Sequence, residues 1–456
     1  MKKVLSTVAA LGLVAGLAST AAAVEFKMSG KYMVEGAYLS DSRGAGVVTT
    51  EAATVSNPTD AYWLHTFEIK PTMKVNDKVS MSSVIRLADD SIWGSQTAGD
   101  VNSTGTKVGG TTGDVYVHQL YMDYASPIGN VRLGRTPAGT YGTNFMDFDK
   151  RANRVMWYPS FLTDGPWSTL LYMEKGTDQQ TMAASSATYQ SDKDSTKLVA
   201  RVYYKNDSLD SGIHYAYGRN MTEATKFLDV STPSIKDVKD ELTVYGKYKM
   251  DNYFANAELT HYFGKVDWTT STHNDYDSWA GMLQVGGKFD ALTPSLMYFY
   301  AQGQDRTSTD LEAALVGSTV AGSGTGDQFE PLYILTGRNT GMLNTDIFSG
   351  NTGNLATAGV HAIVAAADYA VSNQLTLHGA IGWAKADEKV TSAGTATLDD
   401  SYGWEYNLGA AYKLLDNLTY EAHFGYLATG DYFNGNSTTD ITKNVYILTH
   451  SLTMSF

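Results

Sequence analysis

The chain contains no cysteine, only 9 prolines in 456 residues, and no apolar run after residue 23 that is long enough to cross a bilayer as a helix. The absence of cysteine excludes disulfides, zinc–thiolate sites, iron–sulfur clusters and thioether-linked haem. The formal net charge of −14 argues against a nucleic-acid partner, because phosphates require a basic surface. A membrane location would therefore require a closed β-barrel, in which every backbone group is paired without a helix.

The first 23 residues have the pattern of a secretory signal peptide. Lys2 and Lys3 precede a run of small and aliphatic residues that ends in three alanines at 21–23. The run is shorter than the ~20 residues that a spanning helix needs, and no cysteine follows it to carry a lipid anchor. We therefore expect residues 1–23 to be a signal peptide and residues 24–456 to form one domain.

Apolar and polar residues alternate along most of the chain, which has 30 Tyr, 15 Phe, 8 Trp and 43 Gly. Near the start, Phe26, Met28 and Tyr32 fall on one face of a strand, and Lys27 and Lys31 fall on the other. The same alternation recurs at 241–250, 279–289 and 402–412. Strands of about ten residues separated by turn signals are typical of a transmembrane β-barrel. A soluble β-sandwich would alternate too, but aromatic residues gathered near strand ends favour a wall that meets lipid headgroups.

Short and long connections follow each other in turn along the chain. The short ones lie near 76–78, 126–130, 162–166, 206–211, 251–252, 292–293, 372–373 and 416–417. The long ones run through roughly 40–60, 89–113, 136–152, 176–194, 221–238, 268–276, 305–358, 389–399 and 431–442. This pattern predicts an all-β antiparallel barrel of 18 strands, with 16 or 20 as alternatives, short periplasmic turns and long extracellular loops. Segment 305–358 contains a strand-like stretch, FEPLYILTG. Three roles stay open for this segment: plugging the pore, clasping a neighbouring subunit or binding a surface partner.

The last strand has its apolar face at alternate positions up to the final residue. Leu452, Met454 and Phe456 belong to this face. The pattern resembles the C-terminal assembly signal of Gram-negative outer-membrane proteins, which implies the barrel-assembly machinery as a partner. Phe456 would equally suit a plain interfacial aromatic residue.

Residues 121–176 carry a more specific resemblance. A strand ends at Leu133-Gly134-Arg135, a loop covers 136–152, and the stretch NRVMWYPSF returns as a strand. This region resembles the trimeric porins of Gram-negative outer membranes. The resemblance implies a homotrimer in contact with lipid and lipopolysaccharide, and a third extracellular loop that folds into the barrel. The loop is shorter than in many enteric porins and lacks their Pro-Glu-Phe-Gly element, and 18 strands are typical of substrate-selective relatives rather than of 16-stranded general porins.

Charged residues in this loop and on the facing strands are the candidate site. The predicted pore-constriction residues are Asp147, Asp149, Lys150, Arg151 and Arg154, and the predicted pore-wall residues are Lys31, Glu68, Lys70, Arg86 and Arg132. Opposed acidic and basic rows would create a transverse field that orients dipolar solutes and ranks ions by sign. Solvated loop charges are the alternative reading of the first group.

No sequence motif points to catalysis. The nine histidines form no metal-binding pattern, and there is no nucleophile elbow, phosphate-binding loop, dinucleotide fingerprint or calcium loop. We therefore expect no enzyme and no cofactor, and predict a passive outer-membrane channel for small hydrophilic solutes and ions. The alternatives are a substrate-selective porin with lumen tyrosines such as Tyr203 and Tyr245, and a barrel scaffold for surface partner proteins. Solute and ion selectivity, and divalent-cation binding by acidic loops, stay open.

Overall fold

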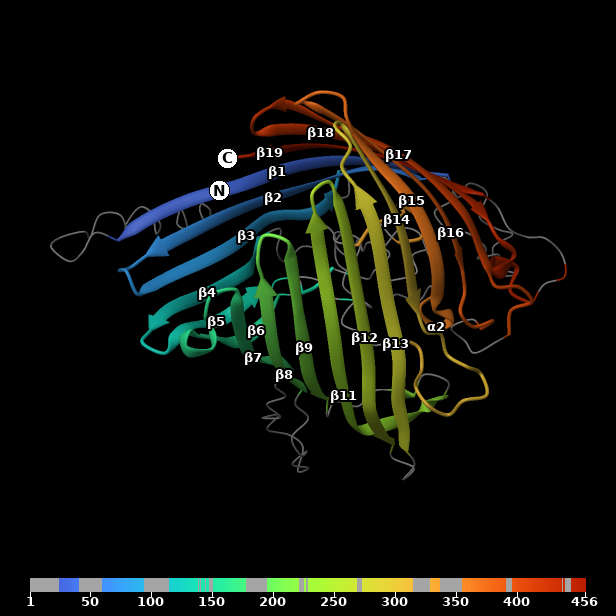
Figure 1. The fold of residues 1–456 in the computed structure, drawn as a ribbon, viewed down its shortest axis with the longest axis horizontal. Coiled ribbons are helices and arrows are strands. Elements are labelled where there is room, and N and C mark those ends of the chain that lie inside the picture. Colours follow the sequence, from blue (N-terminus) through green and yellow to red (C-terminus); the bar gives the residue numbers. More distant parts are fainter. Residues whose placement is uncertain are drawn as a thin grey trace.

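The protein is a closed antiparallel β-barrel (Figure 1). The computed structural model describes residues 24–40, 60–93, 115–137, 139, 141–143, 145–146, 151–177, 195–220, 225–226, 229–268, 273–314, 329–336, 355–390, 396–436, 438 and 444–456. In this part of the chain no helix is long and apolar enough to cross a membrane. The short helical segments are η2 (Ser160–Leu162), α2 (Leu355–Ala358) and η4 (Asp431–Asn434).

Eighteen strands form the wall, as the alternation predicts. They are β1 (Glu25–Leu39), β2 (Asp60–Lys74), β3 (Val79–Ile92), β4 (Tyr116–Ser126), β5 (Gly129–Pro137), β6 (Arg151–Pro159), β7 (Trp167–Thr177), β8 (Ser195–Lys205), β9 (Leu209–Asn220), β11 (Asp229–Met250), β12 (Tyr253–Trp268), β13 (His273–Gly287), β14 (Leu292–Ala301), β15 (Val360–Ala370), β16 (Leu375–Lys385), β17 (Ser401–Leu415), β18 (Leu418–Thr429) and β19 (Val445–Ser455). The two-residue strand β10 (Thr225–Lys226) pairs with β11 alone among the described strands.

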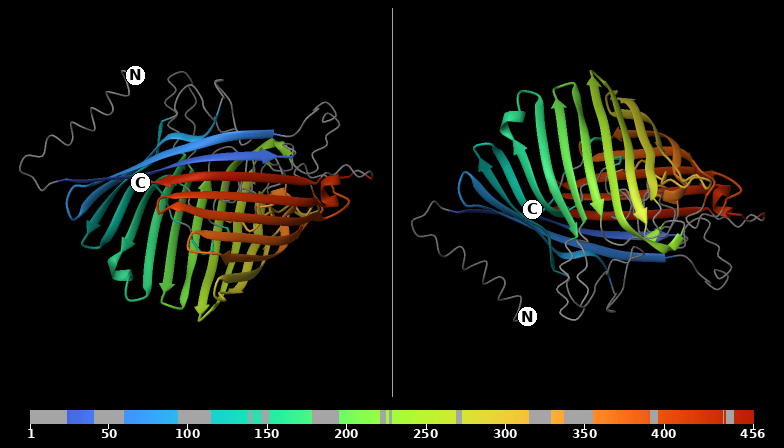
Figure 2. Two further views of the ribbon diagram at one scale, coloured as in Figure 1. Left: turned by 90° about the horizontal axis from the view of Figure 1, so that it is seen from above. Right: turned by 90° about the horizontal axis from the view of Figure 1, so that it is seen from below.

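The first and last strands close the wall. β1 pairs with β2 on one side and with β19 on the other, in a register that runs from Lys31 opposite Ser455 to Leu39 opposite Ile447. The backbone of Phe456 donates to and accepts from Gly30, at 3.0 and 2.9 Å. Both views of Figure 2 show red β19 beside blue β1. Closure pairs each of the eighteen described wall strands on both sides, so the wall itself has no open edge.

The two faces of the wall have opposite chemistry. On β12, Leu259 is 47% exposed on the outside, whereas Glu258 and Thr260 are 3% and 0% exposed on the inside. On β13 the outward Leu283 is 52% exposed. A soluble sandwich would bury its apolar face, so an apolar exterior around a polar interior is the arrangement of a barrel with lipid outside.

Short turns and long connections sit at opposite ends of the barrel, as predicted. In the turn after β2 the side chain of Asn76 accepts from the backbone N–H groups of Lys78 and Val79, at 2.8 and 2.9 Å. One predicted turn is misplaced: residues 292–293 begin β14. The reversal lies just before them, where Asp290 has φ of 54°. Asp tolerates this left-handed conformation better than a bulky residue would.

The strand-like stretch in segment 305–358 is not a strand. Residues 329–336 form turns and bends, with Leu332, Ile334 and Leu335 almost fully buried. Their burial places this stretch against the inner wall rather than in it.

Candidate functional site inside the barrel

Four of the five predicted pore-wall residues come together on the inner face of β1–β3. Glu68 on β2 is 4% exposed and accepts from Arg86 on β3 at 3.0 Å. The ammonium group of Lys70 lies 2.9 Å from the other carboxylate oxygen. Lys31 on β1 stands opposite Glu68 in the strand register. Two cations therefore pair with one buried carboxylate, and a third cationic residue stands opposite it in the register.

The fifth pore-wall residue, Arg132 on β5, lies apart from this cluster. It donates twice to Asp123 on β4, at 2.7 and 3.1 Å, and its guanidinium lies 4.3 Å from the ring centre of Tyr121. Paired N–H donors of this kind hold a carboxylate in a fixed orientation.

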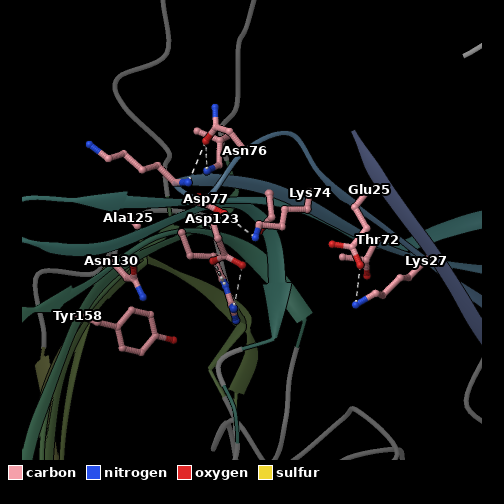
Figure 3. Close-up of a pocket in the computed structure, with 14 residues that line it drawn as sticks. Glu25, Lys27, Thr72, Lys74, Asn76, Asp77, Asp123, Ala125, Asn130 and Tyr158 are labelled. Carbon is pink, nitrogen blue, oxygen red and sulfur yellow. Dashed lines mark hydrogen bonds and ion pairs between the residues drawn. The ribbon is translucent and has the colours of Figure 1, made fainter. Parts of the chain in front are cut away.

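Arg132 lines a cavity of about 680 Å³ at the short-turn end of the barrel. Figure 3 shows the ion pairs around it: Lys27 with Glu25 at 2.8 Å and Lys74 with Asp77 at 2.7 Å. Because β1–β6 supply its lining, this cavity is the periplasmic mouth of the lumen along these strands.

The third long connection folds into the barrel, as the porin resemblance implies. Tyr141, Phe145 and Met146 are each 1% exposed. Glu258 on β12 accepts from the backbone N–H groups of Thr143 and Met146, at 2.6 and 3.1 Å, and from the Thr143 hydroxyl at 2.9 Å. One carboxylate thus binds the main chain of this segment, which we call the first inserted segment, residues 139–146.

Two further contacts hold the first inserted segment. Arg201 on β8 donates to the carbonyl of Gly139 at 3.1 Å. The ring of Tyr141 packs on those of Tyr203, His214 and Tyr245, with centroids 5.6, 5.0 and 4.8 Å away. Burial, with Tyr245 and Tyr203 nearby, raises the pKa of Tyr141, so this phenol stays protonated in ordinary buffers.

The predicted constriction residues divide into two groups. Asp147, Asp149 and Lys150 lie outside the described residues. The predicted loop bound of 152 was too late for Arg151, because β6 begins at this residue, and Arg154 lies on the returning strand, as expected. Arg154 is 4% exposed on the inner wall, 2.6 Å from Glu174 and 2.6 Å from the carbonyl of Thr136.

Arg151 shares its strand face with the outward Val155, by the alternation of β6. It is therefore placed away from the lumen side of the wall.

A second inserted segment, residues 329–336, lies within segment 305–358, for which plugging of the pore was one of the roles left open. Glu405 on β17 is 0% exposed and accepts from the backbone N–H groups of Ile334 and Leu335, both at 2.8 Å. The hydroxyl of Tyr333 lies 3.0 Å from His423 Nδ1 on β18. The sequence signal was an apolar stretch inside a long polar connection, which alternation alone reads as a strand.

The two inserted segments meet inside the barrel. The rings of Phe145 and Phe329 lie 5.0 Å apart, and Phe299 on β14 touches both, at 5.9 and 5.3 Å. A cavity of about 270 Å³ beside this contact is lined by residues that include Thr143 and Lys247. In the described part of the chain, the polar contacts given above for both segments come from β8, β12, β17 and β18, and none comes from β1–β6.

No group of three His, Asp or Glu side chains is placed to hold a metal ion in the described ranges. His214 and His423 face the interior, where they contact Arg201 and Tyr333.

Comparison with known proteins identifies the fold. No family model matches the chain, and no curated protein does. Among solved structures, OccK1 (OpdK) of Pseudomonas aeruginosa matches with a TM-score of 0.52 and 13% identity, over 94% of this chain and 99% of that one. OccK8 (OprE) of the same organism gives 0.48 and 12%, over 94% and 98%. An anion-selective porin from Comamonas acidovorans gives 0.44 and 11%, over 95% and 100%.

The similarity to OccK1 extends over nearly the whole of both chains, so it concerns the complete barrel. The chain therefore has the 18-stranded fold of Gram-negative outer-membrane porins, and the resemblance predicted from residues 121–176 is confirmed at the level of the fold.

Proposed function

We propose that the protein is a passive diffusion channel of the outer membrane for small hydrophilic solutes and ions. The observation that carries this proposal is the charged inner wall of β1–β6, which encloses polar space inside a barrel with an apolar exterior. Such a wall replaces part of a solute's hydration while lipid stays outside.

The two inserted segments assign a path to the solute. The first inserted segment is held by β8 and β12, and β12 lies across the barrel from the Glu68 cluster. The second is held by β17 and β18, which only β19 separates from β1. A solute passes between the inserted segments and β1–β6, and its charge meets Lys31, Lys70 and Arg86 on one side. Diffusion down a gradient needs no further machinery.

A substrate-selective channel is the second candidate. The segment contacts favour it, because two inserted segments that meet at Phe145 and Phe329 narrow a lumen more than one would. Stacking of sugars on Tyr203 and Tyr245 is not its basis, since the ring of Tyr141 already packs on both.

A homotrimer in contact with lipid and lipopolysaccharide, assembled by the barrel-assembly machinery through Phe456, completes the proposal. Its support is the apolar exterior, which includes Leu452, Met454 and Phe456 among its exposed residues.

Single-channel recording in a planar bilayer tests the proposal. We expect stepwise conductance, in groups of three for a trimer, that is absent with the same protein after heat unfolding. Saturable block by one solute class would identify the selective alternative. A folded, strand-rich preparation that gives no conductance would contradict a channel of either kind.

A further inference from the structure

Several ion pairs inside the barrel have one partner that is more exposed to water than the other. Where a lumen carboxylate pairs with a cation, the cation tends to stand nearer the water. The side chain of Lys70 is 48% exposed and that of Arg86 is 18% exposed, whereas Glu68, which both contact, is 5% exposed. Lys31 stands opposite Glu68 in the register, so three cationic residues and one acidic residue share this part of the wall.

The facing wall shows the same order. The side chain of Lys205 is 74% exposed against 30% for Asp210, and that of Lys197 is 20% exposed against 8% for Glu241. Three pairs depart from it. Arg154 is less exposed than Glu174, at 2% and 10%, and Arg132 and Asp123 are exposed alike, at 25% and 30%.

The third departure is at the periplasmic turn, where Asp77 is more exposed than Lys74. That pair lies at the mouth of the channel, as does Lys205 with Asp210 beside the turn between β8 and β9.

The carboxylates that hold the inserted segments do not reach the water. Glu258 and Glu405 are 3% and 0% exposed and accept from backbone N–H groups. Amide donors around a carboxylate stabilise its charge where it is buried. These two acids therefore sit behind the inserted segments as seen from the solute path.

We propose that the channel prefers small anions to cations, although the whole chain has a formal net charge of −14, and that Lys31, Lys70 and Arg86 around Glu68 set this preference. The inference rests on the proposed channel function. Salt screens exposed charges beyond about 10 Å at 0.1 M, so a passing ion responds to the nearest side chains and not to the total charge of the protein. Around Glu68 the more exposed side chains are the cations Lys70 and Arg86.

The test is the reversal potential of the reconstituted full-length protein under a potassium chloride gradient. We expect chloride to permeate more readily than potassium. The Lys31→Gln, Lys70→Gln double variant should lower the chloride-to-potassium permeability ratio by about twofold or more, the size of effect that unit charges exert across several ångströms of water. Glu68→Gln should raise the ratio, because the three cations then act alone.

Two further variants keep the result interpretable. Lys288→Gln removes one positive charge at an exposed turn residue between β13 and β14, and should leave the ratio unchanged. If the double variant folds poorly, a variant with Lys31, Lys70, Arg86 and Glu68 all changed to glutamine replaces it, because it leaves no unpaired buried charge at this site. Its chloride-to-potassium permeability ratio should be near one.

Each other outcome contradicts the inference. Conductance with a potassium preference in the wild type would overturn the anion preference while the channel function stands. An anion preference that is unchanged in the glutamine variants would remove the assignment to this site. Absence of conductance in folded protein would instead count against the channel function itself.

Discussion

Two parts of the same barrel use their inward carboxylates differently. On β1–β3, Glu68 has Lys31 and Arg86 as its register neighbours. On β12, Glu258 has Tyr245 and Met282 beside it, which offer no positive charge.

Glu405 on β17 resembles Glu258, because its register neighbours are Gly382 and Leu427. A buried carboxylate needs donors. Where the neighbouring strands supply cations, the acid becomes part of a charged wall. Where they do not, a segment of the chain supplies its backbone N–H groups and comes to lie inside the barrel.

The largest effect of a substitution is expected where β1 pairs with β19 and closes the barrel. Phe456 bonds to Gly30 through its backbone, and its ring leaves no room for a Cβ on Gly30, which would lie 2.6 Å from the nearest ring carbon. Phe456→Ser should reduce the amount of closed barrel several-fold, measured as heat-resistant oligomer in outer-membrane fractions. Tyr446→Ser, farther along the same outward face of β19, is the matched control. Equal yields of wild type and Phe456→Ser would show that the terminal ring is dispensable for closure.

Among the variants that affect the inserted segments, removal of the Glu405 carboxylate should change the single-channel conductance most. Glu405→Ala leaves the N–H groups of Ile334 and Leu335 without their acceptor, at about 1–3 kcal/mol for each buried group. We expect the second inserted segment to leave the wall and the single-channel conductance to rise.

Glu421→Ala provides the comparison, since Glu421 lies on the inner face of the neighbouring strand. It lies 3.8 Å from His423, which contacts Tyr333, so this variant disturbs a side-chain contact of the segment and keeps the carboxylate that binds its backbone. If both variants conduct like the wild type, the second inserted segment does not limit the pore.

A smaller change in conductance is expected from removal of the Glu258 carboxylate, which binds the first inserted segment. Glu258→Ala removes the acceptor of Thr143 and Met146, but Arg201 still binds the carbonyl of Gly139. We predict noisier current with a modest rise in conductance, recorded under the same conditions. A rise larger than that of Glu405→Ala would reverse the order of the two anchors.

The smallest effect should come from the contact between the segments. Phe329→Ala removes the ring that joins Phe145 and Phe299, while both carboxylate anchors stay in place. Combined with Glu258→Ala, it should change conductance by more than the two single variants together, because residues in contact do not act additively. Strict additivity would show that the segments move independently.

The wall was predictable from the sequence because its information is local. Alternation at period two sets which side chains face inward, and it brought Lys31, Glu68, Lys70 and Arg86 together before their contacts were known. The misplaced turn at 292–293 and the early start of β6 at Arg151 are boundary errors, where polar residues suit strand and turn alike.

The second inserted segment could not be predicted in the same way. Glu405 binds the backbone of Ile334 and Leu335, 71 and 70 residues away in the chain, and every residue except proline has that N–H group. The residue types in the segment therefore do not indicate that its backbone binds Glu405. The only trace is an inward glutamate whose register neighbours carry no positive charge, and this trace depends on knowing the register.

Because Glu405 binds backbone N–H groups, the attachment of the second inserted segment does not depend on the side chains at the attached positions. Any residue except proline has the N–H group that is needed at 334 and 335. Substitutions at the half-buried Glu330 and Pro331, which line the cavity of about 270 Å³, can therefore alter the lining of the channel while Glu405 still binds the segment. Point substitutions in the segment can therefore change the permeation properties of the channel while the strands of the wall stay the same.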